Sequence, residues 1–66
     1  MAIPKAPINR IIKENGAERI SASAVDELVA YLEEEAARVS KKAIENAKIA
    51  KRQTVKDEDI KLAIDN

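Results

Sequence analysis

A long segment without helix-breaking residues constrains this chain more than any other feature. Residues 22–49 contain neither glycine nor proline and are rich in alanine, glutamate and lysine, which all favour helix. We therefore predict one continuous helix over about 22–49, about 40 Å long at the usual rise per residue. Its apolar side chains recur at spacings of three and four, and we expect them to form one stripe comprising Ala24, Leu28, Leu32, Ala36, Val39, Ala43 and Ala47.

Shorter helices are predicted on both sides of this segment. Two prolines suit the start of a helix, and isoleucines recur after them at helical spacing. Asn15-Gly16 is a helix-stop signal. Together these signals predict a helix over about 5–15. Ser21 is the expected N-cap of the long helix. An acidic first turn at 57–59 begins a third helix, preceded by a short extended segment at 54–55. The predicted fold class is all-α, in the order short helix, long helix, short helix.

The long helix cannot be covered by its own chain. Two flanking helices of about ten residues each leave its middle, around Tyr31, Val39 and Ile44, without a partner. The chain has 66 residues with no cysteine and no histidine, so neither disulfides nor a zinc site compensates for a small core. We expect a symmetric homodimer with crossed central helices. A long antiparallel coiled coil is the alternative, but it leaves the flanking helices without a role.

Charge is balanced overall but unevenly distributed along the chain. The net charge is zero, yet residues 1–21 and 41–56 are net basic while residues 22–40 and 57–66 are net acidic. A fold that brings the two basic segments together would have a positive face. Ordinary solvated helix faces are the plainer interpretation of the charges taken alone.

Several classes of function are disfavoured by what the sequence lacks. Without histidine, cysteine or a glycine-rich phosphate loop, we expect no catalytic site, no metal site, no cofactor and no small-molecule substrate. No apolar run is long enough to span a membrane and no secretory leader is recognisable, so we expect a cytoplasmic protein without a membrane partner. Tyr31 is the only aromatic residue, which disfavours binding of single strands by base stacking.

Three blocks of the sequence resemble archaeal histones. APINRIIK (6–13) is similar to the opening helix of that family, GAERIS (16–21) to its first loop, and RQTVKDEDIKLAI (52–64) to its second loop and last helix. The resemblance implies one histone-fold domain over residues 1–66 and a head-to-tail "handshake" homodimer, in which each first loop lies beside the partner's second loop. It also implies an architectural chromatin protein on the chromosome, or nucleoid, that binds, wraps and compacts double-stranded DNA without reading its sequence.

The resemblance further implies which residues contact DNA. Arg19 would enter the minor groove, braced by Thr54 of the paired loop, although a solvated loop arginine is the plainer alternative. Gln53 stands where the family commonly has lysine, so we expect weaker or more salt-sensitive compaction than in a more basic relative. The remaining expected DNA contacts, mainly to phosphate, are Arg10, Lys13, Ser21 and Lys56.

Other residues are implied to act in structure and assembly. Arg52 is expected to form an ion pair with Asp59 inside the chain, which would hold the shape of the second loop; a contact with DNA phosphate is the alternative for this residue. Gly16 would allow stacked turns of DNA to approach closely. Contacts between dimers, giving tetramers or filaments on DNA, are expected at Asn46, Ile49, Asp59 and Leu62. Asn46 and Ile49 depart from the apolar residue and histidine often found there, and ordinary dimer core is the alternative for Ile49 and Leu62.

Two further alternatives stay open at this point. The partner in the cell is either a second copy of the chain or a histone paralogue. The chain is either a DNA-compacting histone or a histone-fold module that pairs with another protein and binds DNA weakly. The neutral charge and Gln53 favour the module, whereas Arg10, Arg19, Arg52 and Thr54 together favour the DNA-binding protein.

Overall fold

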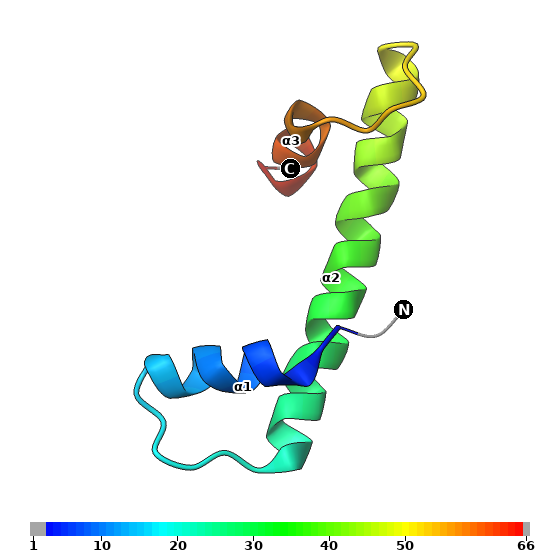
Figure 1. Cartoon of the computed structure of the whole chain (residues 1–66). Helices are drawn as coiled ribbons and strands as arrows, with labels where there is room; N and C mark the ends of the chain where they lie inside the picture. The colour runs from blue at the N-terminus through cyan, green and yellow to red at the C-terminus, as the bar shows by residue number, and fades with distance from the viewer. Residues whose placement is uncertain (1–2, 66) are drawn as a thin grey trace. The chain divides into compact units, whose positions relative to one another are not determined.

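The computed structural model describes residues 3–65, which form three helices connected by short loops (Figure 1). This confirms the predicted all-α class and the order short, long, short. The chain divides into two compact units, Met1–Glu34 and Glu35–Asn66, and α2 runs from one into the other. None of the helices in the described part of the chain is long and apolar enough to cross a membrane. The helices are α1 (Lys5–Glu14), α2 (Ala22–Ile49) and α3 (Asp57–Asp65).

The end of α1 is closed by a hydrogen-bonded cap at the predicted stop signal. Asn15 is the C-cap residue, one position after the last helical residue. The N–H of Gly16 donates to the carbonyl of Lys13 at 3.0 Å, and the N–H of Ala17 donates to that of Ile12 at 3.4 Å, which is the Schellman pattern. Gly16 has a φ of 115°, which residues with a side chain rarely adopt. Glycine therefore lets α1 end here without backbone strain.

The apolar core of the first unit lies between α1 and the beginning of α2. Ile8, Val25 and Val29 are buried in it. Of the predicted stripe, Leu28 and Leu32 pack against this core, whereas Ala24 is exposed. The stripe also omitted Val25 and Val29, which are buried beside Ile8. Their branched side chains fill the space beside Ile8 that alanine would leave empty. Partly buried side chains that pack against this core are Ile3, Ile12, Ile20, Leu28 and Leu32.

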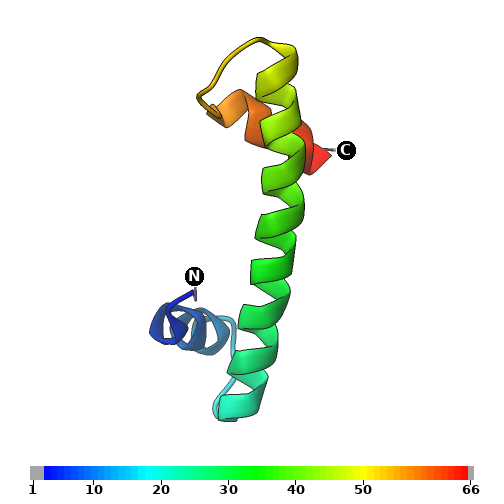
Figure 2. The same ribbon diagram turned by 90° about the vertical axis from the view of Figure 1, so that its right-hand side faces the viewer.

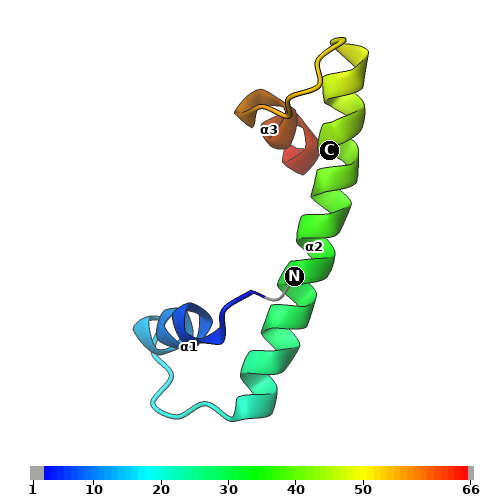
Figure 3. The same ribbon diagram turned by 45° about the vertical axis from the view of Figure 1, so that its right-hand side comes forward.

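In the second unit α2 ends with the same cap but without a glycine. The N–H of Lys51 donates to the carbonyl of Lys48, and the N–H of Arg52 donates to that of Ala47, both at 2.9 Å. Lys51 has a φ of 60°, the left-handed conformation that glycine usually supplies. No strand is assigned at the predicted extended segment 54–55. Gln53 and Thr54 form a bend, and the chain returns from the end of α2 to α3 (Figure 3).

The core of the second unit contains only small or polar side chains. Ala43, Ala47, Ala63 and Asp59 are buried, and none of the larger apolar side chains between residues 35 and 65 is. Several isoleucine side chains are exposed to solvent instead, including Ile44 at 44 % exposure. Tyr31, in the part of α2 that belongs to the first unit, is 57 % exposed. The middle of α2, an unbroken helix in Figure 2, therefore has apolar surface that its own chain does not cover, as the sequence predicted.

Candidate nucleic-acid interface

The candidate DNA-contacting residues of the first unit are all exposed. Arg10 and Lys13 follow buried Ile8 by two and five positions, so helical periodicity places them on the side of α1 away from the core. Arg19 is exposed in the loop between α1 and α2. The structure thus presents these three cations to solvent from one helix and the loop that follows it.

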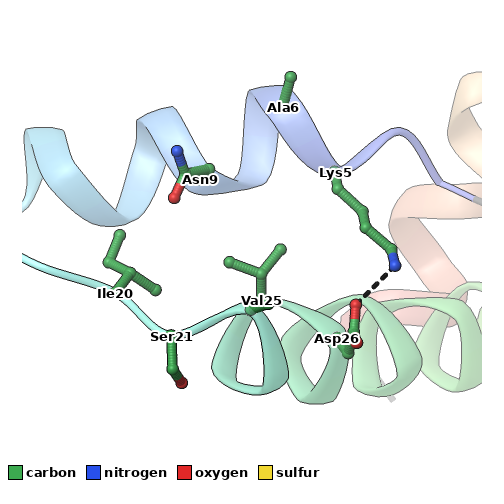
Figure 4. Close-up of a pocket in the computed structure, with 8 residues that line it drawn as sticks. Lys5, Ala6, Asn9, Ile20, Ser21, Val25 and Asp26 are labelled. Atoms are coloured by element: carbon green, nitrogen blue, oxygen red, sulfur yellow. Dashed lines mark ion pairs between the residues drawn. The ribbon is translucent and has the colours of Figure 1, made fainter.

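Ser21 caps the beginning of α2, as predicted. Its Oγ accepts a hydrogen bond from the N–H of Ala24 at 3.1 Å, and its carbonyl accepts one from Val25 at 3.3 Å. The hydroxyl also lies 3.2 Å from that of Ser23. Figure 4 shows the Ser21 side chain pointing away from α1. The helix N-terminus, with its partial positive charge, is therefore open to solvent beside a hydroxyl.

One cation of the first unit is already paired. Lys5 Nζ lies 2.6 Å from Asp26 Oδ1, an exposed ion pair that connects α1 to the second turn of α2 (Figure 4). In contrast, none of the ion pairs between described residues involves Arg10, Lys13 or Arg19. These three charges remain available to an anionic partner, whereas Lys5 is engaged in holding the unit together.

The second loop is organised around the predicted ion pair, which is present. Arg52 Nη1 lies 2.7 Å from Asp59 Oδ2, and Nη2 donates to Oδ1 at 3.0 Å, giving a two-pronged contact. Nη1 also donates to the carbonyl of Thr54 at 3.1 Å. The backbone N–H of Lys56 donates to Asp59 Oδ2 at 2.8 Å, which satisfies a donor at the start of α3. One buried carboxylate thus fixes both the loop and the first turn of α3.

These contacts determine the ionisation of the pair. The hydrogen bonds from Arg52, followed by the one from the Lys56 N–H, lower the pKa of Asp59 to about 2. The same contact with Asp59 raises the pKa of Arg52. Both groups are charged across the neutral range, so the guanidinium is committed to the loop and is not a free contact for phosphate.

The other candidate residues of the second loop face solvent. The side chains of Gln53, Thr54 and Lys56 are exposed, and Arg52 uses the carbonyl of Thr54 rather than its hydroxyl. Lys51 is exposed as well, and the sequence pattern did not indicate it as a candidate because the family resemblance begins one residue later. The contact between Arg19 and Thr54 is expected between two chains, so it stays a prediction.

The four residues predicted to join dimers line one groove of the second unit. Asn46, Ile49, Asp59 and Leu62 border it together with Ala50, Arg52 and Glu58. Ile49 is 81 % exposed and Leu62 53 %, so neither belongs to the core of the chain itself. Asn46 Nδ2 donates to the carbonyl of Asp59 at 3.2 Å. The carboxylate of Asp59 is turned to Arg52, so this residue supports the groove from within.

Metal chemistry finds no ligands here. Across residues 3–65, no group of three or more aspartate or glutamate side chains is placed to hold a metal ion. Among the acidic side chains, Glu35 is paired with Arg38 in α2 at 3.0 Å.

Known proteins resemble the chain over nearly its whole length. Residues 1–64 match the family described as histone-like transcription factor (CBF/NF-Y) and archaeal histone. An archaeal histone of Thermococcus zilligii, described as a subunit of HAN1, is 53 % identical, and probable archaeal histone 3 of Methanocaldococcus jannaschii is 45 % identical, each alignment covering 94 % of this chain and 92 % of the relative. DNA-binding protein HmvA of the latter organism is 44 % identical over 89 % of this chain and 62 % of its own length. None of these descriptions names an enzyme.

Proposed function

Because the chain belongs to the family of histone-like transcription factors (CBF/NF-Y) and archaeal histones, we propose that it is a chromatin protein that binds and bends double-stranded DNA. One observation carries the proposal: the first unit presents three exposed cations outside the printed ion pairs, Arg10, Lys13 and Arg19, and an exposed, Ser21-capped start of α2. Duplex DNA presents a dense row of phosphates, and cations and helix N-termini bind them without reading sequence. The protein would therefore act on the chromosome in the cytoplasm.

Arg19 has a distinct role in this proposal. A planar guanidinium fits a narrow, negative minor groove, and the bending that such insertion permits favours deformable DNA. Thr54 of a partner chain would brace it, with Gln53 and Lys56 contacting the adjacent backbone. The Arg52–Asp59 ion pair supports this arrangement because it fixes the loop from which these three side chains extend.

The DNA contact is tested by a matched pair of arginine substitutions. Arg19→Ala is expected to weaken binding to duplex DNA and to make the salt dependence shallower by about 0.9 for each phosphate that is no longer neutralised. Arg38→Ala removes the same charge from the acidic segment of α2, outside the proposed interface, and should leave both quantities almost unchanged. If Arg19→Ala binds DNA as the parent protein does, the chain is better described as a protein-interaction module.

We infer that the working form is a homodimer in which the two units of each chain act as one histone-fold domain. A core of three alanines and one aspartate in the second unit is too small to stabilise it alone. The exposed side chain of Ile44 supplies apolar surface that a crossed α2 of a second copy would bury. A histone paralogue is the alternative partner, since one relative is itself described as part of an assembly.

A second surface supports assembly beyond the dimer. Helical periodicity places Ile44 and Ile49 on opposite flanks of the buried strip formed by Ala43 and Ala47. One partner cannot cover both flanks at once. We assign the Ile44 flank to the dimer, and the groove containing Ile49 to a contact between dimers.

Asn46 favours pairing of this groove with the same groove of a second copy. An amide has two N–H donors and a carbonyl, and the contact with Asp59 uses only one donor. Across a two-fold axis, two copies of Asn46 would satisfy each other, whereas an apolar partner would leave the amide buried without hydrogen bonds. The groove therefore favours a second copy of itself.

Sedimentation of two glutamate variants distinguishes the two surfaces. Ile44→Glu should shift the free protein from dimer toward monomer. Ile49→Glu should leave the free dimer intact and abolish only the larger species that form by crosslinking on DNA. If Ile49→Glu dissociates the free dimer, Ile49 belongs to the dimer core and the second surface is wrongly assigned.

A further inference from the structure

The end of α1 contains a dipeptide whose chemical reactivity plays no part in the proposed function. Asn15 is followed by Gly16, the only glycine of the chain, and both are exposed. An asparagine cyclises most readily before glycine, because no side chain shields the backbone nitrogen that must attack it. We propose that Asn15 is a site of spontaneous deamidation, and that the hydrogen bonds of the α1 cap control its reactivity.

The reaction needs only water. The backbone nitrogen of Gly16 loses its proton and attacks Cγ of Asn15, forming a new C–N bond. The side-chain nitrogen takes up a proton and leaves as ammonia, so a five-membered succinimide remains. Water then opens the ring at either carbonyl and gives aspartate or isoaspartate at position 15. The net change is addition of one water and loss of one ammonia, without oxidation or reduction.

The cap holds both reacting groups. The attacking nitrogen of Gly16 donates its hydrogen to the carbonyl of Lys13 at 3.0 Å. The leaving amide donates from Nδ2 of Asn15 to the carbonyl of Ile11 at 2.8 Å, and the backbone N–H of Asn15 donates to the same carbonyl at 3.1 Å. The hydrogen bond from Gly16 must break before its nitrogen attacks, and the one from Asn15 Nδ2 must break before ammonia leaves. Folding therefore restrains the reaction through hydrogen bonds.

The surroundings of the dipeptide are open. Asn15 and Gly16 are exposed, and a Cβ placed on Gly16 would meet nothing within 4 Å. Because both residues are exposed, opening of the cap at these two residues displaces no buried side chain. Local fraying of this helix end, and not global unfolding, is then the event that sets the rate.

The product would weaken the same end of α1. A carboxylate at position 15 cannot donate to Ile11, and it places a negative charge at the negative end of the helix dipole. It also adds an anion to the loop that carries Arg19. This last consequence rests on the proposed function, since a negative charge near the phosphates would oppose DNA binding. Deamidation would act as a one-way reduction of DNA affinity.

Peptide mapping by mass spectrometry tests the site in the full-length protein. Samples are incubated at mildly alkaline pH in buffer and in denaturant, with Asn9 and Asn46 as internal controls because Arg10 and Ala47 follow them. In denaturant, Asn15 should react first, and Gly16→Ala should slow it at least tenfold, roughly what shielding of the nitrogen implies. In buffer, Asn15 should react at least about tenfold more slowly than in denaturant, as expected for a cap that is closed most of the time.

Two results would overturn the proposal. If Asn9 or Asn46 reacts as fast as Asn15 in denaturant, the dipeptide is not a special site. If Asn15 reacts equally fast in buffer and in denaturant, the cap does not control it. Asn15→Asp, compared with the parent protein, should bind DNA more weakly. If Asn15→Asp binds DNA as the parent protein does, deamidation has no effect on DNA binding, but Asn15 can still be the site of modification. The two proposals are therefore tested separately.

Discussion

Lys51 occupies a backbone conformation that a glycine would adopt without strain. It is the residue after the C-cap of α2, its φ is 60°, and its N–H and that of Arg52 complete the cap. A residue with a Cβ in this region is disfavoured by about 1–2 kcal/mol. Glycine avoids this conformational cost. Its greater freedom in the unfolded chain, however, lowers the free energy of unfolding by about 0.4–1 kcal/mol, which offsets part of the gain. We expect Lys51→Gly to stabilise each chain by about 0.5–1 kcal/mol.

Thermal unfolding without DNA measures this effect. For a chain of this size, about 1 kcal/mol corresponds to a shift in Tm of about 4–8 °C, provided the protein concentration is held constant. Lys51→Ala is the matched control, because it removes the same charge from the end of α2 but retains the Cβ. It should be slightly less stable than the parent protein. If Lys51→Gly is no more stable than Lys51→Ala, the left-handed conformation is not strained and the reasoning fails.

Other substitutions test the remaining parts of the account. Gly16→Ala should lower stability by about 1 kcal/mol, as thermal unfolding would show, because the φ of 115° disfavours a Cβ where no neighbour clashes with it. The fold lowers the pKa of Asp59 from 3.8 to about 2. The ionised carboxylate should therefore stabilise the fold fully above about pH 4, and this contribution should be lost as the pH falls toward 2. Acid titrations of Asp59→Asn should lack this component. Gln53→Lys should raise DNA affinity, so that binding persists to a higher salt concentration, while the slope of log affinity against log salt steepens by about 0.9 for each additional phosphate neutralised; an unchanged slope would exclude position 53 from the interface.

The helices were predictable because their boundaries depend on local chemistry. The absence of glycine and proline defined α2, the Asn15-Gly16 pair placed the end of α1, and the acidic turn beginning at Asp57 placed the start of α3. Each signal acts through the backbone within a few residues. Caps and stop signals of this kind can be read from the sequence because they do not depend on tertiary contacts.

Two features of α2 were not predicted from the sequence. One depends on packing against α1, and the other on a backbone conformation that is uncommon for a residue other than glycine. Val25 and Val29 face Ile8 because α1 folds back onto this side of α2, which a single stripe drawn along α2 alone could not reveal. The cap at Lys51 was missed because its position is normally occupied by glycine.

The site was predicted residue by residue through resemblance to the family. The ion pair of Arg52 with Asp59 and the exposure of Arg19 agree with it. A single chain contains only half of the proposed interface, since Arg19 and its brace Thr54 come from different copies. Their meeting depends on the dimer, which neither local sequence signals nor one chain can determine.

Nuclease digestion of DNA reconstituted with the protein tests the central claim most directly. A dimer that bends duplex DNA around itself should protect a defined length, and added dimers should extend the protected fragments by a constant increment. Arg19→Ala should lose this pattern at a protein concentration where Arg38→Ala retains it. A smear without protected fragments, from a protein that sedimentation shows to be dimeric, would contradict the proposed DNA-bending function.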